Sequence, residues 1–429
     1  MKKILITGTC FFLLMFMVGC GSDAEVEEKA IPEVEPTTEV VPSVEDVTVV
    51  EDFTEQNEAL ILEITEARKK TIEEDAETYF PNQLSELDKL SNEAIDAYKN
   101  GGDGKEFFDV ASDIIKKYES LKLASSVAKI RNEALDLGAE KYFSDELKKF
   151  DDENIAVLEK IDYTDYDDFN KKALKAFDDY GVIKESTIVM NAREKALENH
   201  VNEYFPNELQ VVDIFASEGL AVYQDGGEKQ DFDVVANDSL YQYKALEQAA
   251  MIAKNQEKID ALGFEQYAPD AYARGVDASE KAMTLFNTGA DGETLFNETI
   301  KARKQFDIVL LEGYTVLAKD KKIEYLETIA MANEIKANLA DKENYLIATD
   351  TCEKADAELI AKNPEKALEL FELANLQMTK VYSRVYKKRQ EAESYINRAT
   401  QSVGRADEIA EKADIIAPKT DETLVEGEE

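Results

Sequence analysis

The chain has 429 residues and a formal charge of −41, because 91 acidic side chains oppose 50 basic ones. This charge argues against binding to nucleic acid and against electrostatic docking on anionic lipid, since both need a basic surface. Three cysteines are too few for a disulfide framework.

The first residues have the organisation of an export signal. Two lysines follow Met1, and an apolar run then continues to Val18, which is too short to span a bilayer. The run ends in Met-Val-Gly-Cys at positions 17–20, which resembles the lipobox of bacterial lipoproteins. In that family the cysteine is lipidated and the chain is cut before it. The resemblance implies a signal peptide over residues 1–19 and acylation of Cys20; an ordinary secretory signal is the alternative.

Lipidation would place the protein in the cell envelope. Two or three acyl chains, palmitate among them, would hold it on the cell membrane or the outer membrane without a spanning helix. The membrane is therefore an expected partner through this lipid.

An acidic stalk is expected to follow the anchor, over residues 20–54. Between positions 21 and 52 there are eleven acidic residues, one lysine and three prolines. Proline blocks helix formation and like charges extend the chain, so this segment is predicted to be disordered. The acidic end, residues 416–429, is predicted to be disordered as well.

From residue 55 the composition changes to one rich in Ala, Glu, Lys and Leu, and short turn signals recur at a fixed distance. A Tyr-Phe or Tyr-Ala pair, usually followed by proline, returns every 62 or 63 residues. The expected turn residues are Tyr79, Pro81, Tyr142, Tyr204, Pro206, Tyr267 and Pro269. A second turn signal stands 22 residues after each tyrosine, at Gly101, Thr164, Gly226 and Gly289. Such a double period indicates a repeat protein, with a fifth, degenerate copy marked by Leu339 and Asn363-Pro364.

Apolar residues between the turn signals have helical spacing. The first copy predicts a short helix over 83–100 and a long helix over 105–140. The residue after each proline position is expected to cap the next helix; these residues are Asn82, Asp145, Asn207 and Asp270. Glycines interrupt the predicted helices at Gly181, Gly219, Gly275 and Gly313.

These lengths predict an all-α, elongated helical repeat array over residues 55–415, with four to five repeats of 62–63 residues. If a long helix spans two levels and a short helix returns by one, each level is a three-helix bundle that shares helices with its neighbours. The arrangement resembles the spectrin-type rod in topology only. A curved solenoid of helix pairs is the alternative.

The turn sequence also resembles repeats of uncharacterised spirochaete-type and other bacterial envelope lipoproteins. That resemblance rests on a four-residue turn and periodic alanine, and it implies no activity.

Residues with catalytic chemistry are scarce. His200 is the single histidine, so multi-histidine metal sites and His-based triads cannot form, and a capping or surface role is expected for it. The glycines at 101, 102 and 104 join two helices and predict a tight helix end. Asp162, Asp165 and their acidic neighbours lack the EF-hand order and predict a solvated N-cap. Cys352 is expected to be a small buried side chain. We expect no catalytic residue, no metal and no cofactor.

The aromatic columns at helical spacing are predicted to form core, whereas the turn aromatics are expected either to seal the bundle ends or to protrude. The sequence therefore favours a lipid-anchored structural spacer or protein-interaction scaffold, with a protein partner that the sequence does not identify. The alternative is a surface or periplasmic binding module, a receptor or adhesin, for a protein, peptide or basic ligand. An enzyme is not expected, and neither is a nucleic-acid partner.

Overall fold

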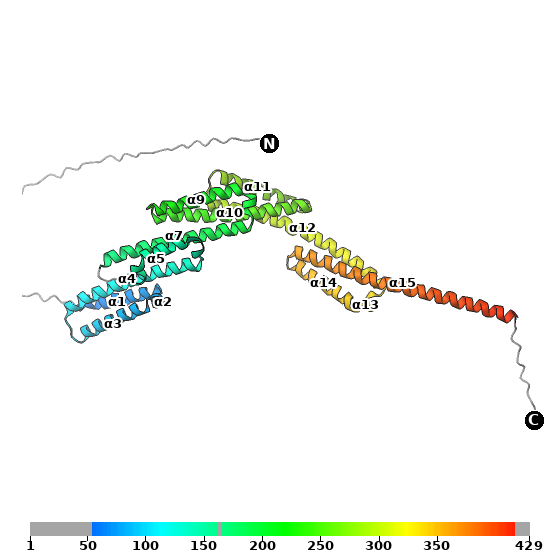
Figure 1. The fold of residues 1–429 in the computed structure, drawn as a ribbon, viewed down its shortest axis with the longest axis horizontal. Coiled ribbons are helices and arrows are strands. Elements are labelled where there is room, and N and C mark those ends of the chain that lie inside the picture. The colour runs from blue at the N-terminus through cyan, green and yellow to red at the C-terminus, as the bar shows by residue number, and fades with distance from the viewer. Residues whose placement is uncertain (1–53, 162–164, 417–429) are drawn as a thin grey trace, which may run out of the picture. The chain divides into compact units, whose positions relative to one another are not determined.

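The computed structural model describes residues 54–161 and 165–416, and these residues form an all-α helical repeat array (Figure 1). The described part of the chain contains no strand. The predicted fold class is therefore confirmed. The predicted signal peptide, Cys20, nearly all of the acidic stalk and the acidic end lie outside the described residues.

Each repeat is built from a long helix, a one-turn helix and a helix of intermediate length. The long helices are α4 (Gly104–Asp136), α7 (Tyr166–Glu198), α10 (Lys229–Leu262), α12 (Gly292–Glu334) and α15 (Pro364–Ile416), and α1 (Thr54–Glu73) precedes them. The one-turn helices are α2 (Ala76–Tyr79), α8 (Val201–Tyr204), the 3-10 helix η1 (Phe264–Tyr267) and α13 (Ala337–Ala340). The intermediate helices are α3 (Pro81–Lys99), α9 (Pro206–Gln224), α11 (Pro269–Asn287) and α14 (Lys342–Ile360), with α5 (Glu140–Glu153) and α6 (Ile155–Leu158) taking this place in the second repeat.

A residue in the left-handed backbone conformation follows each of the helices α1, α4, α7, α10 and α12. Glycine occupies this position after α4 and α10, as expected for a helix C-terminus. In the other three cases the residue is Asp75 (φ 62°), His200 (φ 64°) or Lys336 (φ 56°). The predicted long helix over 105–140 consequently stops at Asp136, since Gly138 takes φ 90°.

The predicted N-caps are wrong. Asn82, Asn207 and Asp270 lie inside their helices, one residue after a proline that occupies the first helical position. Proline is favoured there because its missing N–H would have no partner in the first turn, and its fixed φ suits the helix. The residues that precede the prolines, Phe80 among them, take the cap position without a side-chain cap hydrogen bond. Asp145 likewise lies within α5.

Successive long helices run in the same direction, and side-chain hydrogen bonds fix their register. Asn57 of α1 donates to the backbone oxygen of Gly104 at 2.8 Å, and Thr71 donates to that of Tyr118 at 2.9 Å. Positions 47 residues apart are thus level at both places, which requires a parallel pair. The α12–α15 pair has the same 47-residue offset, where Thr328 donates to Asn375 at 2.7 Å.

Each of the long helices α4, α7, α10 and α12 divides its contacts between two neighbouring long helices. The first half of α4 packs on α1, while Glu133, near its other end, pairs with Lys184 of α7 at 2.7 Å. This sharing agrees with the predicted linkage of bundles through common helices. The closer comparison with the spectrin-type rod stays a prediction.

The aromatic column predicted to be core is buried. Tyr118, Tyr180 and Phe306 are fully buried and Tyr243 is 1% exposed. Leucines and valines of the intermediate helices, such as Leu84 and Val212, close the same layer. The apolar faces of these repeats are therefore buried in contacts between their own helices.

Candidate functional site

The predicted turn residues lie at the junctions between helices. Tyr79, Tyr204 and Tyr267 end the one-turn helices α2, α8 and η1, and Pro81, Pro206 and Pro269 begin the intermediate helices that follow. Tyr142 lies inside α5, next to a kink at Phe143, whose backbone is non-helical (φ −132°, ψ 36°). A junction thus occurs at every predicted turn, although in the second repeat it is a kink between two helical segments.

Two turn tyrosines attach their junction to the next long helix. The Tyr142 hydroxyl donates to Glu194 of α7 at 2.7 Å, and the Tyr204 hydroxyl donates to Glu257 of α10 at 3.0 Å. Tyr267 is 37% exposed. Of the two roles left open for the turn aromatics, sealing of the junction fits Tyr142 and Tyr204.

An Arg–Asp–Tyr cluster recurs in the first three repeats and joins two successive long helices to the intermediate helix between them. In the first cluster Nε and Nη2 of Arg68 each donate to the Asp88 carboxylate at 2.7 Å, and the Tyr118 hydroxyl donates to the same carboxylate at 2.7 Å. The second cluster contains Arg131, Asp151 and Tyr180 at 2.6–2.7 Å, and the third contains Arg193, Asp213 and Tyr243 at 2.6–2.8 Å.

The electrostatics of these clusters keep the aspartate charged. Burial opposes ionisation of Asp88, but hydrogen bonds from Arg68 and Tyr118 outweigh burial and lower the pKa of the carboxyl below its usual value. Burial and the neighbouring Asp88 raise the pKa of the Tyr118 hydroxyl, so it remains a donor. Asp151 and Asp213 have pKa values lowered in the same manner. Each cluster is therefore a fixed ion pair with a neutral phenol, which suits positioning of helices better than proton transfer.

Our sequence reasoning missed these clusters, although a signal was available. Arginine recurs 11 residues before each of the first three turn tyrosines, and aspartate recurs nine residues after them. At the fourth turn the positions that correspond to the arginine, the aspartate and the tyrosine of the cluster hold Gln256, Val276 and Phe306. The three members are thus replaced together by uncharged residues.

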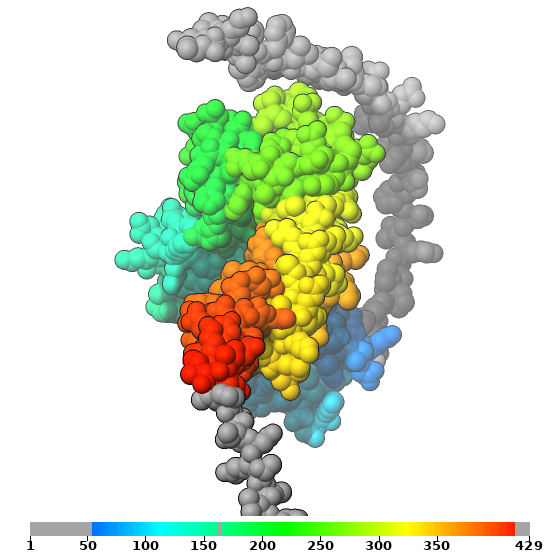
Figure 2. All heavy atoms as spheres, turned by 90° about the vertical axis from the view of Figure 1, so that its right-hand side faces the viewer, coloured from blue at the N-terminus to red at the C-terminus, as the bar shows by residue number. Residues whose placement is uncertain are grey.

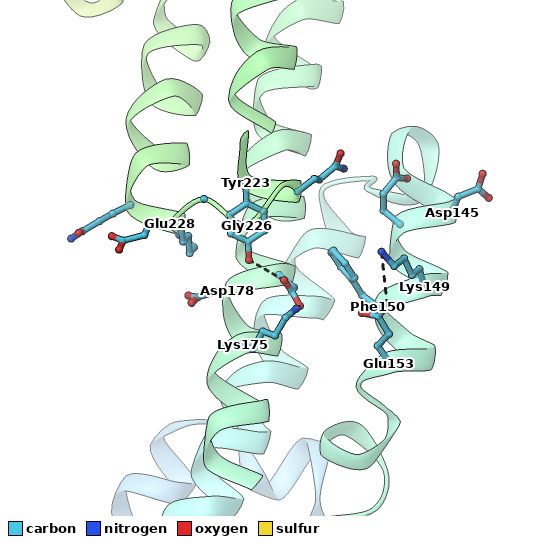
Figure 3. Close-up of a pocket in the computed structure, with 15 residues that line it drawn as sticks. Asp145, Lys149, Phe150, Glu153, Lys175, Asp178, Tyr223, Gly226 and Glu228 are labelled. Atoms are coloured by element: carbon cyan, nitrogen blue, oxygen red, sulfur yellow. Dashed lines mark hydrogen bonds and ion pairs between the residues drawn. The ribbon is translucent and has the colours of Figure 1, made fainter. Parts of the chain in front are cut away.

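A large cleft lies where the second and third repeats meet (Figure 3). It has a volume of about 1030 Å³ and is open to solvent. One wall is α5, with Lys149, Phe150 and Glu153, while the turn between α9 and α10 forms the opposite side. Six carboxylates and three lysines line it; the carboxylates are Asp145, Glu146, Glu153, Asp178, Asp179 and Glu228. The cleft is acidic on balance.

Two adjacent carboxyls of α7 differ within this cleft. Asp179 is 3% exposed and accepts from Lys175 at 2.6 Å and from the Tyr223 hydroxyl at 2.9 Å, so its charge is compensated. Burial raises the pKa of Asp178, Lys229 opposes this effect, and the nearby Asp179 adds to it. Asp178 is thus the less compensated carboxylate of the pair.

Smaller apolar pockets repeat at corresponding positions of two junctions. One, of about 300 Å³, is lined by Phe143, Val189 and Leu220; the other, of about 280 Å³, is lined by their counterparts Phe205, Ile252 and Met283. Each contains a serine hydroxyl without a hydrogen-bond partner, Ser186 in the first pocket and Ser279 in the second.

The remaining residues considered in the sequence have structural surroundings. His200 is the left-handed residue before α8, and its Nδ1 lies 3.1 Å from Glu203. Gly101 has φ 95° at the end of α3, where the Gly102 amide donates to the Ala97 oxygen at 3.0 Å. Asp165 caps α7 by accepting from the Asp168 amide. Asp162 lies outside the described residues.

Cys352 is buried, and burial raises the pKa of its thiol to about 11, which leaves it protonated at neutral pH. Within residues 54–161 and 165–416, no three or more His, Cys, Asp or Glu side chains are grouped so that they could hold a metal ion. None of the helices in this part of the chain is long and apolar enough to cross a membrane.

Comparisons with protein-family models and with curated proteins give no match to this chain.

Proposed function

We propose that this chain is a structural spacer and protein-interaction scaffold of the bacterial cell envelope, held on a membrane by a lipid on Cys20. The observation that carries the proposal is that the recurring polar residues inside the array bind one another. The arginines, aspartates and tyrosines that recur with the repeat bind one another across three helices, at distances of 2.6–2.8 Å. Such residues fix the spacing of helices, which is the property that a spacer needs.

The anchor is tested by exchanging Cys20 for serine and feeding cells a fatty-acid probe. We expect the variant to stay as an unprocessed precursor that takes up no label, because the acylated thiol is gone. A Cys10→Ser variant is the matched control, since Cys10 lies inside the apolar run, and it should be labelled like the native protein. Undiminished labelling of the Cys20 variant would contradict the anchor.

The spacer role is tested by removing one repeat in register. Deleting residues 139–200 takes out 62 residues and joins Gly138, the left-handed residue that follows α4, to Val201, which begins α8. Energy transfer from a membrane dye to a label after the last residue should increase, because the label comes closer to the membrane. An unchanged transfer efficiency in the folded, anchored variant would contradict the spacer.

A binding module for a basic ligand is the second candidate, and the cleft of Figure 3 favours it. Its six carboxylates exceed its three lysines, so a cationic peptide would be attracted and steered into it. Titration of an oligolysine peptide against Glu153→Gln/Glu228→Gln should give weaker binding than titration against the native chain. The same two exchanges at surface glutamates far from the cleft, Glu327 and Glu334, are the matched control. Equal weakening of binding by the cleft variant and by the control variant would mean that the peptide responds to the net charge of the chain and does not bind in the cleft.

A catalytic role is not proposed. Asp178 has a raised pKa, as a general acid would need, but Asp179 beside it is held as a compensated carboxylate by Lys175 and Tyr223. Among the described residues that line this cleft there is no serine, threonine, cysteine or histidine, so the pair lacks the partners of a Ser- or Cys-based hydrolytic triad.

A further inference from the structure

The second half of α15 differs from the second halves of the other long helices. In α4, for example, residues 120–134 include six buried positions, because α7 packs on them. Residues 387–416 of α15 are all exposed. We call this segment the α15 tail. Figure 1 shows this tail continuing beyond α13 and α14, and Figure 2 shows its last turns, in red, uncovered toward the viewer.

The α15 tail carries an apolar stripe with coiled-coil spacing. Ile396 and Val403 are 63% and 60% exposed and stand seven residues apart. Ala399 lies between them, and further alanines continue the stripe on both sides at steps of three and four, namely Ala392, Ala406, Ala410 and Ala413. The stripe continues the buried face of the first half of α15, which ends at Val385. A 30-residue helix with such a stripe is the kind of surface that packs on another helix.

The charge of the tail identifies the partner. The whole chain has a formal charge of −41, but the α15 tail contains six basic and six acidic side chains. The basic ones are Lys387, Lys388, Arg389, Arg398, Arg405 and Lys412, and the acidic ones are Glu391, Glu393, Asp407, Glu408, Glu411 and Asp414. Five of the six positive charges come before position 406, and four of the six negative charges come after it. A second copy of this tail, turned end for end, has the complementary distribution.

We propose that the α15 tails of two copies of this chain pair as an antiparallel coiled coil. In the register centred on Gln401, Ile396 faces the partner's Ala406 and Val403 faces the partner's Ala399. Each branched side chain then meets a small one, which lets the helices approach closely. A parallel pair would bring the two basic segments together and would place Arg389 against its own copy in the seam, at a cost from like charges.

The interface is independent of the anchor and of the spacer role. It uses only residues beyond the last covered turn of α15, and it would join two arrays at their C-terminal ends. Paired tails would also make the proposed Cys20 anchor bivalent, because a dimer contains two copies of that residue.

Sedimentation of the purified full-length chain in detergent tests the pairing. We expect a concentration-dependent dimer whose dissociation constant rises by about tenfold or more in Val403→Glu, because two charges would enter the seam. Gln401→Glu adds the same charge on the opposite face of the helix and should leave the dimer unchanged. A chain that remains monomeric overturns the proposal, whether its tail then binds vesicles or another protein. A dimer that Val403→Glu does not weaken overturns it as well.

Disulfide trapping tests the orientation separately. In the proposed register position 392 faces position 410 of the partner, and the two copies of position 392 lie roughly 27 Å apart along the helix. Ala392→Cys and Ala410→Cys should therefore not form disulfide dimers alone, whereas the double variant should form them. Efficient dimers of either single variant, beyond those of the native chain, would overturn the antiparallel arrangement. The tail lies outside the bundles, so these variants keep the native unfolding transition of the array.

Discussion

Gly313 of α12 lies directly against the ring of Phe264. A Cβ atom added at position 313 would stand 2.3 Å from two carbons of that ring, closer than van der Waals contact allows. Phe264 is fully buried in η1, and it also meets Tyr314 edge to face, with ring centroids 5.0 Å apart. Glycine at this point lets the junction of the fourth repeat press against the middle of a long helix.

Gly313→Ala is therefore expected to destabilise the protein, although alanine normally strengthens a helix. Displacing a buried ring typically costs 1–3 kcal/mol, about twice what the helix propensity of alanine contributes. Urea unfolding should show a lower midpoint. Gly404→Ala is the matched control, since nothing lies within 4 Å of the added Cβ there. Equal or greater stability of Gly313→Ala would contradict the close contact.

The Arg–Asp–Tyr clusters predict a non-additive set of variants. Asp213→Val leaves the guanidinium of Arg193 and the hydroxyl of Tyr243 without their acceptor, and we expect a loss of about 1–3 kcal/mol, reduced by the partial exposure of the pair. The triple variant Arg193→Gln/Asp213→Val/Tyr243→Phe installs the set found at the fourth turn, and it should recover most of that loss. Urea unfolding measures both. A triple variant less stable than the single one would contradict the reading of the cluster as one unit.

Acid should unfold the array through the same aspartates. The pKa values of Asp88, Asp151 and Asp213 are lowered from 3.8 in the folded chain. Because the unfolded chain binds these protons first, the stability that the three carboxylates contribute is complete above pH 3.8 and is lost as the pH falls through their lowered values. The free energy of unfolding should therefore decline below about pH 4. The triple variant lacks one of these carboxylates and should decline less steeply.

Asp178 should behave in the opposite sense. Burial raises its pKa, so its ionised form is disfavoured in the folded chain and costs stability once the pH exceeds the usual value of 3.8. Asp178→Asn is expected to raise the unfolding midpoint at pH 7, and the gain should disappear below pH 3.8, where the native carboxyl is protonated in both states. Asp350→Asn, at a carboxylate of α14 paired with Lys354 at 2.7 Å, is the control that should bring no gain. A gain that persists in acid would point to another cause.

The sequence predicts the regular parts of this fold better than its junctions. Tyr118, Tyr180, Tyr243 and Phe306 are core, as their helical spacing indicates. The ends of the long helices were harder to place, because Asp75, His200 and Lys336 take a left-handed conformation that such residues rarely adopt.

The clusters were missed for a different reason. In a chain with 33% charged residues, a single arginine or aspartate cannot be distinguished from an ordinary charged surface residue. Arg68 and Asp88 can be distinguished from the neighbouring charged residues only because each recurs at a fixed distance from the repeating tyrosines. The acidic cleft could not be predicted at all, because α5 and the turn before α10 are brought together by packing alone.

The repeat itself makes the strongest prediction, since a deletion should be tolerated only in register. Removing residues 139–200 places Asp213 twenty positions after Arg131 and leaves Tyr243 thirty positions after Asp213, which are the spacings of the native third cluster. The shortened chain should regain a complete cluster of Arg131, Asp213 and Tyr243 and unfold cooperatively, because repeat arrays are stabilised by contacts between neighbouring repeats. Removing only residues 139–169 shifts the apolar faces out of phase and breaks the cluster. We expect that control to lose cooperative thermal unfolding by circular dichroism, and equal behaviour of the two deletions would contradict the repeat register.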